Sequence, residues 1–314
     1  MGKTLELAIA ILNGAVGDHL ARSSNGLATE MSLVQDGAPV SLDRAALAAA
    51  HPEATTKVAV FLHGLMCSES VWEMDGGDYG ALLARDRGYT PLYVRYNSGL
   101  AIADNGAAFA GLLETVVDAW PSGVTEILPV GFSMGGLVTR SACHVASLAD
   151  QRWLRLVKRA FYVGTPHLGA PLERYGRVAA KLLAKVPDPY ARLIADLANL
   201  RSDGVKDLGD ADVRHEDRAR RQATISLRDP RHPVPLLASI RHYLVAGSLS
   251  ADARLAELFG DVMVPVPSAT DGQIGRAQFA LPPSHVKIIS GVAHMTLAHH
   301  PDVYTQLAAW CGEE

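Results

Sequence analysis

The stretch LPVGFSMGGLVTRSA, residues 128–142, places a serine between two glycines where an apolar run ends and a helix-like pattern begins. Its centre, GFSMG at residues 131–135, fits the pattern G-x-S-x-G of a nucleophile elbow, where a serine sits on a sharp strand-to-helix turn with its hydroxyl exposed. Glycines suit such a turn because a side chain would crowd it. The alternative is an ordinary strand–helix loop that contains a serine, so a base, an acid and an oxyanion hole must be sought elsewhere in the chain.

The composition is that of a globular protein with a large core. The 314 residues are 48% hydrophobic and 20% charged, and the net charge is −4. This length fits two domains, or one large α/β domain with an insertion. Charges of both signs are scattered without a basic block, so we expect no nucleic-acid partner.

The cysteines and the N-terminal residues indicate the cellular compartment in which the protein is expected. The cysteines are odd in number, far apart and form no C-x-x-C pair, which favours a reducing compartment; they are Cys67, Cys143 and Cys311. The apolar run at residues 5–16 contains Glu6 and Asn13 and is too short to span a bilayer. Its helical spacing predicts an amphipathic docking helix, without the charge and cleavage site of a signal peptide. We therefore expect a cytoplasmic protein with no stable membrane insertion.

Short apolar runs alternate with helical patterns along most of the chain. Strands are predicted at residues 57–64, 90–99, 126–131, 159–164, 242–247 and 285–290, and helices at 105–120, 137–148 and 301–310. Continuous apolar strands alternating with helices indicate a mostly parallel central sheet covered on both faces. Pro129 conflicts with a central strand, because it has no N–H for the ladder, and a local bulge would accommodate it.

Two further segments complete the predicted organisation. Residues 1–56 are expected to form the N-terminal helix, a hairpin that turns at Asp36-Gly37 and a short helix capped by Asp43, packed on the core. The α/β core then comprises residues 57–170 and 242–314. Residues 171–241 separate two consecutive strands and contain amphipathic stretches followed by a charge-rich piece. We read them as an inserted helical cap or lid.

The general base is sought after the last strand, since α/β-hydrolases order the triad as serine, acid and histidine. His294 lies in a loop just beyond that strand. His285 begins the strand and would lie at the opposite end of the sheet, while His299 and His300 fall near a helix start and are read as surface residues. His294 is therefore the predicted base.

The acid should follow the preceding strand, where three aspartates are candidates. Asp261 lies in a glycine-containing loop before the rigid run VMVPVP. Asp252 precedes a helical pattern and reads as a helix N-cap, and Asp271 begins a D-G turn. We favour Asp261 as the acid.

The oxyanion hole needs two backbone N–H groups. Met134 follows the nucleophile and supplies the first; Leu65, in the loop after the strand VAVFLHG, supplies the second, with Gly64 allowing close approach. Cys67 lies near this loop and is read as a buried small residue that contacts substrate, not as a nucleophile. Leu193 and Leu197 of the cap are the other substrate-binding candidates, since their helical face can line an acyl pocket.

Five stretches carry a resemblance to a known family: FLHGLMCSESVW, GFSMGGLVTRSA, VGTPHLGAPLER, GDVMVPVPSA and GVAHMTLAHHPDVY. Together they resemble the lipase-type α/β-hydrolases, in particular the branch similar to GPI inositol-deacylases and bacterial triacylglycerol lipases, and GTPHLGAP is the most specific of them. The resemblance implies an α/β-hydrolase core, the triad Ser133, Asp261 and His294, and Leu65 and Met134 as oxyanion donors. Phe132 stands where such lipases usually carry histidine, and Val262 where glycine usually follows the acid.

The expected activity is hydrolysis of a small-molecule or lipid carboxylic ester through an acyl-enzyme. An acyltransferase that uses the same triad, and a non-catalytic scaffold of the same fold, are the alternatives. His167 precedes the acid in the chain and is expected to play a structural role near the site. The histidines show no H-E-x-x-H pattern, so we expect no metal and no other cofactor. The sequence does not indicate an oligomeric state.

Overall fold

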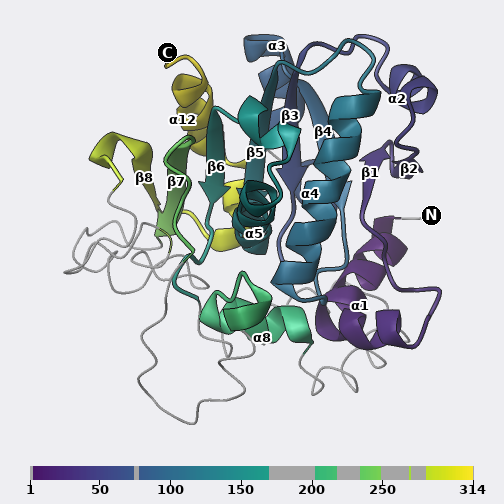
Figure 1. Ribbon diagram of the computed structural model, residues 1–314. Coiled ribbons are helices and arrows are strands. Elements are labelled where there is room, and N and C mark those ends of the chain that lie inside the picture. The colour runs from purple at the N-terminus through teal and green to yellow at the C-terminus, as the bar shows by residue number, and fades with distance from the viewer. Residues whose placement is uncertain are drawn as a thin grey trace.

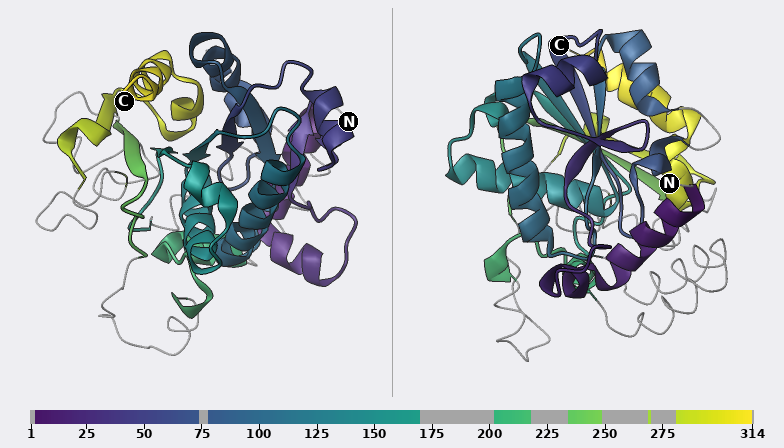
Figure 2. Two further views of the ribbon diagram at one scale, coloured as in Figure 1. Left: turned by 45° about the horizontal axis from the view of Figure 1, so that its top comes forward. Right: turned by 90° about the vertical axis from the view of Figure 1, so that its right-hand side faces the viewer.

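The computed structural model describes residues 3–73, 78–169, 202–217, 234–248, 269 and 281–313. Within these residues the chain forms a three-layered α/β structure, with one sheet between two layers of helices (Figure 1). Helices α4 (Ile102–Ala119) and α5 (Met134–Leu148) cover one face, and α3 (Tyr79–Arg87) and α12 (Pro301–Cys311) cover the other (Figure 2). The predicted sheet with helices on both faces is confirmed.

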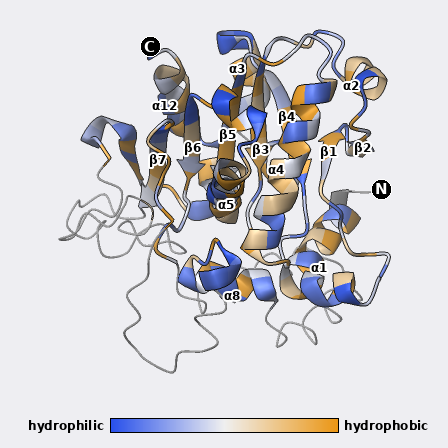
Figure 3. Cartoon of the chain, viewed as in Figure 1, coloured by the Kyte–Doolittle hydropathy of each residue, from blue (hydrophilic) through white to orange (hydrophobic). Residues whose placement is uncertain are grey.

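Eight described strands form the sheet in the order β2-β1-β4-β3-β5-β6-β7-β8. Their bounds are β1 Ser32–Gln35, β2 Ala38–Val40, β3 Lys57–Leu62, β4 Thr90–Arg95, β5 Glu126–Phe132, β6 Arg159–Val163, β7 Arg241–Ser248 and β8 Val286–Ser290. In this order, the six strands from β4 to β8, which include β3, pair in parallel with their neighbours. β1 pairs antiparallel with both β4 and β2. The central strands are apolar almost throughout, as a strand buried on both faces requires (Figure 3).

The two sides of the sheet belong to two separate clusters of buried side chains. Val58, Val60 and Leu62 of β3 pack with the side of α4 and α5. Ala59 and Phe61, which alternate with them, pack with residues of α3 and α12. This is the two-residue alternation of a strand that is covered on both faces.

The remaining described elements connect or flank the sheet. They are α1 (Lys3–Arg22), α2 (Arg44–Ala50), α8 (Asp203–Asp210) and the short 3₁₀ helices η1 (Glu69–Glu73), η2 (Arg152–Leu156), η3 (Pro283–His285) and η4 (His294–His299). The β1–β2 hairpin turns at Asp36 and Gly37, both with positive φ, and Asp43 caps α2 by accepting hydrogen bonds from two backbone N–H groups. Both local features agree with the sequence.

Pro129 lies in β5, between β3 and β6, and a change of register accommodates it. On one side it is paired opposite Val60. On the other, Ile127 bridges to Val157 and the ladder resumes at Val130 opposite Phe161. Four residues of β5, Ile127 to Val130, therefore lie opposite five residues of the neighbouring segment, Val157 to Phe161, so Pro129 falls in an interruption that does not need its missing N–H.

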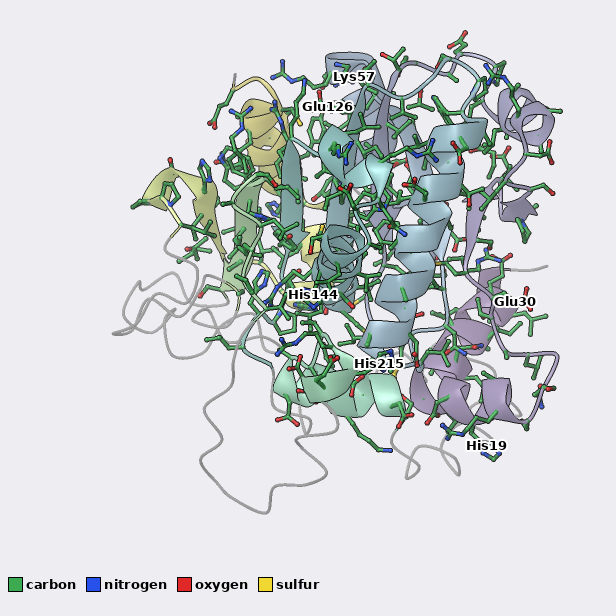
Figure 4. All side chains as sticks on the ribbon, in the orientation of Figure 1. His19, Glu30, Lys57, Glu126, His144 and His215 are labelled. Atoms are coloured by element: carbon green, nitrogen blue, oxygen red, sulfur yellow. The ribbon has the colours of Figure 1, made fainter. Side chains whose placement is uncertain are left out.

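The parallel strands place the candidate site at one edge of the sheet. Lys57 and Glu126 are the first residues of β3 and β5 and lie at the amino ends of the parallel strands. His215 lies near α8, at the other end of these strands (Figure 4). The carboxyl ends of these strands therefore face α1 and α8. Ligands bind at such edges in open α/β sheets.

Candidate active site

Ser133 lies in the sharp turn between β5 and α5. Its backbone has φ of 51° and ψ of −120°, and the residue is 3% exposed. A non-glycine residue with such angles costs about 1–3 kcal/mol and persists only where its surroundings hold it. Here the Ser133 N–H donates to the Val163 carbonyl at 2.8 Å, and the Gly136 N–H donates to the Ser133 carbonyl at 3.1 Å. The strained serine expected of a nucleophile elbow is present.

The glycines around Ser133 are required by close backbone packing. A Cβ on Gly131 would lie 2.5 Å from the Cα of Gly136, and one on Gly135 would lie 2.5 Å from the Leu62 carbonyl oxygen. Gly136 faces Thr165, whose Oγ1 would lie 2.0 Å from an added Cβ. The turn thus packs closely against the ends of β3 and β6, and this packing fixes the position of the serine.

His294 lies at the same edge of the sheet as Ser133. It begins η4, just beyond β8, and is 3% exposed. Its ring centroid is 5.0 Å from that of Phe132, the residue before the serine. Its Cε1 would lie 3.0 Å from a Cβ on Gly164, the residue that follows β6. Phe132 therefore supplies a surface on which the imidazole packs.

The loop after β3 contacts the serine turn directly. A Cβ on Gly64 would lie 3.1 Å from the Ser133 Cβ, so glycine is what lets the two segments approach. Leu65 follows and is 8% exposed. The Gly64 carbonyl accepts a hydrogen bond from the Cys67 N–H at 3.2 Å, and Ser98 Oγ accepts one from the Met66 N–H at 3.0 Å. We call residues 63–67, which contain the predicted oxyanion donor Leu65, the oxyanion loop.

His63 orients the central peptide of the oxyanion loop, a role that we did not predict from the sequence. Its Nε2 accepts from the Tyr96 N–H at 3.3 Å, so Nδ1 carries the proton and donates to the Gly64 carbonyl at 2.8 Å. Burial lowers the pKa of His63 to about 4, which keeps the ring neutral. A trans peptide points its C=O and N–H in opposite directions. Holding the Gly64 carbonyl therefore also aims the Leu65 N–H.

Met134 is the first residue of α5 and follows Ser133 directly. The first N–H groups of a helix have no intrahelical partner and point along the positive end of the helix dipole. Its side chain is fully buried, and its Cε would lie 3.1 Å from a Cβ on Gly204 of α8. α8 thus packs against the serine turn.

α8 is a described helix of the segment that we interpreted as a cap. Ser202 caps it, and the Gly204 N–H donates to the Gly99 carbonyl at 3.0 Å. Asp207, 2% exposed, accepts from the Ile102 N–H at 3.1 Å and so caps α4. α8 is therefore fastened to the loop after β4, at the edge that holds Ser133.

Several predicted site residues lie outside the described part of the chain. These are the favoured acid Asp261, its alternatives Asp252 and Asp271, and the substrate candidates Leu193 and Leu197. Cys67 is described and buried, and burial raises the pKa of its thiol to about 12. The Cys67 Sγ donates to the Leu65 carbonyl at 3.4 Å. A protonated, buried thiol is a poor nucleophile, in agreement with our interpretation.

His167 lies near the site in a buried polar group. The Arg140 guanidinium contacts the ring and the carbonyl of His167, both at 3.4 Å, and donates to the Val234 carbonyl at 2.7 Å. Burial holds the pKa of His167 well below its usual value, and the Arg140 charge adds to this effect. These contacts fit the structural role expected from the sequence.

Acid is expected to destabilise the fold through its buried histidines. Burial lowers the pKa of His63 and of His242 to about 4, whereas unfolded histidine titrates near 6.5. The unfolded chain therefore binds protons that the folded chain does not, and stability falls as the pH drops from about 6.5 to 4, by about 3 kcal/mol for each of the two. Urea unfolding between pH 7 and pH 4.5 measures this loss. His242→Gln should flatten its slope, and an unchanged slope would contradict the assignment.

Two features are absent from the described part of the chain. No described helix is long and apolar enough to cross a membrane. Within the same ranges, no group of three or more His, Cys, Asp or Glu side chains is placed to hold a metal ion.

No family model and no curated sequence matches the chain. Among solved structures, the mature lipase of Bacillus licheniformis is similar, with a TM-score of 0.49 and 20% identity over 81% of this chain and 92% of that one. An esterase of Pyrococcus furiosus has a TM-score of 0.47 and 15% identity over 82% of each chain. A hyperthermophilic esterase of the archaeon Pyrobaculum calidifontis has a TM-score of 0.46 and 13% identity over 98% of this chain and 89% of that one.

The sheet, its helical layers and the strained turn after its central strand define an α/β-hydrolase fold, as the sequence predicted. The finer resemblance to GPI inositol-deacylases and bacterial triacylglycerol lipases stays a prediction, because no family model matches the chain.

Proposed function

We propose that this protein is a carboxylic ester hydrolase that forms an acyl-enzyme on Ser133. The observation that carries the proposal is the strained serine between β5 and α5, with Gly64 of the oxyanion loop against its side chain and His294 packed on the preceding Phe132. A strand-helix loop without a catalytic role needs neither the positive φ nor the close approach of the β3 loop. This is a site-based argument, as the fold alone does not fix a function.

In the proposed reaction, the Ser133 hydroxyl attacks the ester carbonyl while His294 takes its proton. Asp261 orients the imidazole and stabilises its charged form. His294 then protonates the departing alcohol, and the acyl group remains on Ser133. His294 then deprotonates a water molecule, whose oxygen attacks the acyl carbonyl. The tetrahedral intermediate collapses to release the carboxylic acid, and His294 returns the proton to the Ser133 oxygen.

The oxyanion of each tetrahedral intermediate is assigned to the Leu65 and Met134 N–H groups. Each such donor contributes about 3 kcal/mol to stabilising the transition state in comparable sites. Met134 begins a helix, so its N–H lies at the positive end of the α5 dipole. Leu65 belongs to the peptide whose carbonyl is held by His63. Both donors are therefore held before substrate arrives.

A fluorophosphonate probe is expected to label Ser133 and to abolish hydrolysis of p-nitrophenyl esters. The probe is attacked by an activated serine, and the strained turn together with His294 supplies one. Peptide mass spectrometry locates the adduct, and hydrolysis of esters of increasing acyl length is measured on the same samples. An adduct on Cys67 or on another serine, with Ser133 unmodified, would refute the assignment.

A further inference from the structure

We infer that the kinked N-terminal helix α1 positions the oxyanion loop, and that Gly14 is the positioning residue through which it does so. The inference rests on the proposed function, because it concerns the Leu65 N–H as an oxyanion donor. α1 lies far from Ser133 in sequence, at the same edge of the sheet as α8 (Figure 1).

α1 is bent within the segment that faces the site. Val16 has φ of −141° and ψ of 21°, which are not helical angles. Backbone carbonyls around the bend accept hydrogen bonds from outside the helix: Gly14 from Ser202 Oγ at 2.7 Å and Ala15 from the Ser202 N–H at 3.1 Å. The Gly17 carbonyl accepts from Asn97 Nδ2 at 3.0 Å. The bend thus joins α1 to the start of α8 and to the loop after β4.

The bent segment packs on the oxyanion loop without space for a side chain. A Cβ on Gly14 would lie 2.4 Å from Met66 Cγ, 2.8 Å from the Met66 backbone nitrogen and 2.9 Å from its Cα. Two of these three atoms are backbone, so rotating the Met66 side chain would not relieve the contact. A Cβ on Gly99 would likewise lie 2.1 Å from the Asn13 carbonyl oxygen. The helix backbone therefore sets where the backbone of Met66 can lie.

Met66 transmits this constraint to Leu65, because the two share a peptide bond. Met66 has φ of 60°, an unusual conformation for a residue with a side chain, and its N–H is held by Ser98 Oγ. The preceding peptide is held by the bonds to the Gly64 carbonyl. Hydrogen bonds from buried residues thus fix both peptides that flank Leu65, and α1 packs against the other side of the loop at Met66. The Leu65 N–H is aimed by this arrangement, which is how a preorganised donor acts.

Gly14→Ala is the test. We expect kcat for a p-nitrophenyl ester to fall about 10- to 100-fold with KM within about twofold, because a shift of about 1 Å in a catalytic group costs that much. Affinity for a trifluoromethyl ketone, which forms a tetrahedral oxyanion on the serine, should fall by the same factor as kcat/KM. A helix that only stabilises the fold would leave both quantities unchanged in the folded fraction.

Two control variants separate positioning from folding. Gly111→Ala, on α4, makes the same substitution where an added Cβ meets nothing within 4 Å, and should leave kcat unchanged. Leu47→Ala, at the buried residue of α2, should lower the melting temperature and also leave kcat unchanged. If Leu47→Ala lowers kcat as much as Gly14→Ala at an equal loss of melting temperature, the inference is overturned.

A double-mutant cycle tests the route through Met66. Met66→Gly removes the side chain that the Gly14→Ala methyl meets, and glycine accepts a φ of 60° without strain. The Met66 backbone nitrogen and Cα would still lie 2.8 and 2.9 Å from that methyl, so most of the loss of kcat caused by Gly14→Ala should persist in the Met66→Gly background, and a loss that disappears there would contradict the inference. Should Gly14→Ala fail to fold, Ser202→Ala takes its place, because it removes the hydroxyl that holds the Gly14 carbonyl. It too should lower kcat while leaving KM nearly unchanged. A wild-type chain that hydrolyses no ester refutes the proposed function instead.

Discussion

Ser133→Ala is expected to lower kcat for ester hydrolysis by about 10⁶-fold, the loss found when a triad serine is removed. The variant keeps the turn between β5 and α5 but has no atom to attack the carbonyl, so no acyl-enzyme forms. KM for the residual reaction should change little, because the hydroxyl contributes mainly in the transition state. Steady-state kinetics measure the loss of kcat. Fluorophosphonate labelling, which should be lost as well, is measured on the same samples.

Ser141→Ala is the matched control, since Ser141 is also a buried serine and lies on α5, the helix that follows Ser133. It should keep kcat and probe labelling. A Ser133→Ala/His294→Ala double variant should be no less active than Ser133→Ala alone, because residues that act as a unit are not additive. Ester hydrolysis that survives Ser133→Ala would place the chemistry elsewhere in the molecule.

The features that the sequence predicted well are local ones. Gly131 could be identified because it is crowded by Gly135 and Gly136, only a few positions along the chain, whereas Gly135 meets the distant end of β3 at Leu62. The hairpin turn at Asp36-Gly37 and the Asp43 cap likewise depend on neighbours within a few residues. The continuous apolar run of β3 predicts burial on both faces, and both faces are indeed covered.

The features that the sequence did not predict depend on contacts between distant residues. An H-G pair after a strand shows that the loop can approach the serine, but the protonated nitrogen of His63 is fixed by Tyr96, which is 33 residues away. The spacing of apolar residues in α1 predicts a docking face and not the Met66 contact made by Gly14. Pro129 could be flagged as a conflict, yet its resolution needs the register of both neighbouring strands.

Asp261→Asn is expected to lower kcat by about 10⁴-fold, far more than Asp252→Asn or Asp271→Asn. A triad carboxylate accepts the imidazole N–H, fixes which ring nitrogen faces the serine, and stabilises the imidazolium formed during attack. The amide keeps the size of the side chain but carries no charge and can present its NH₂ to the ring, which favours the wrong tautomer of His294. The sequence supports Asp261 because it follows β7 in the chain and directly precedes the proline-containing run VMVPVP.

The two other aspartates serve as internal controls, because each is replaced by the same amide in the same stretch of chain between β7 and β8. Asp252 reads as a helix cap and Asp271 as a turn residue, so their amides should cost stability of about 1 kcal/mol or less and leave kcat near wild type. All three variants are compared by kcat and by melting temperature, which separates a catalytic from a structural loss. If Asp271→Asn is the crippling change and Asp261→Asn is mild, the acid lies in the D-G turn, ten residues further along the chain, and the proposed triad becomes Ser133, Asp271 and His294, with the reaction otherwise unaltered.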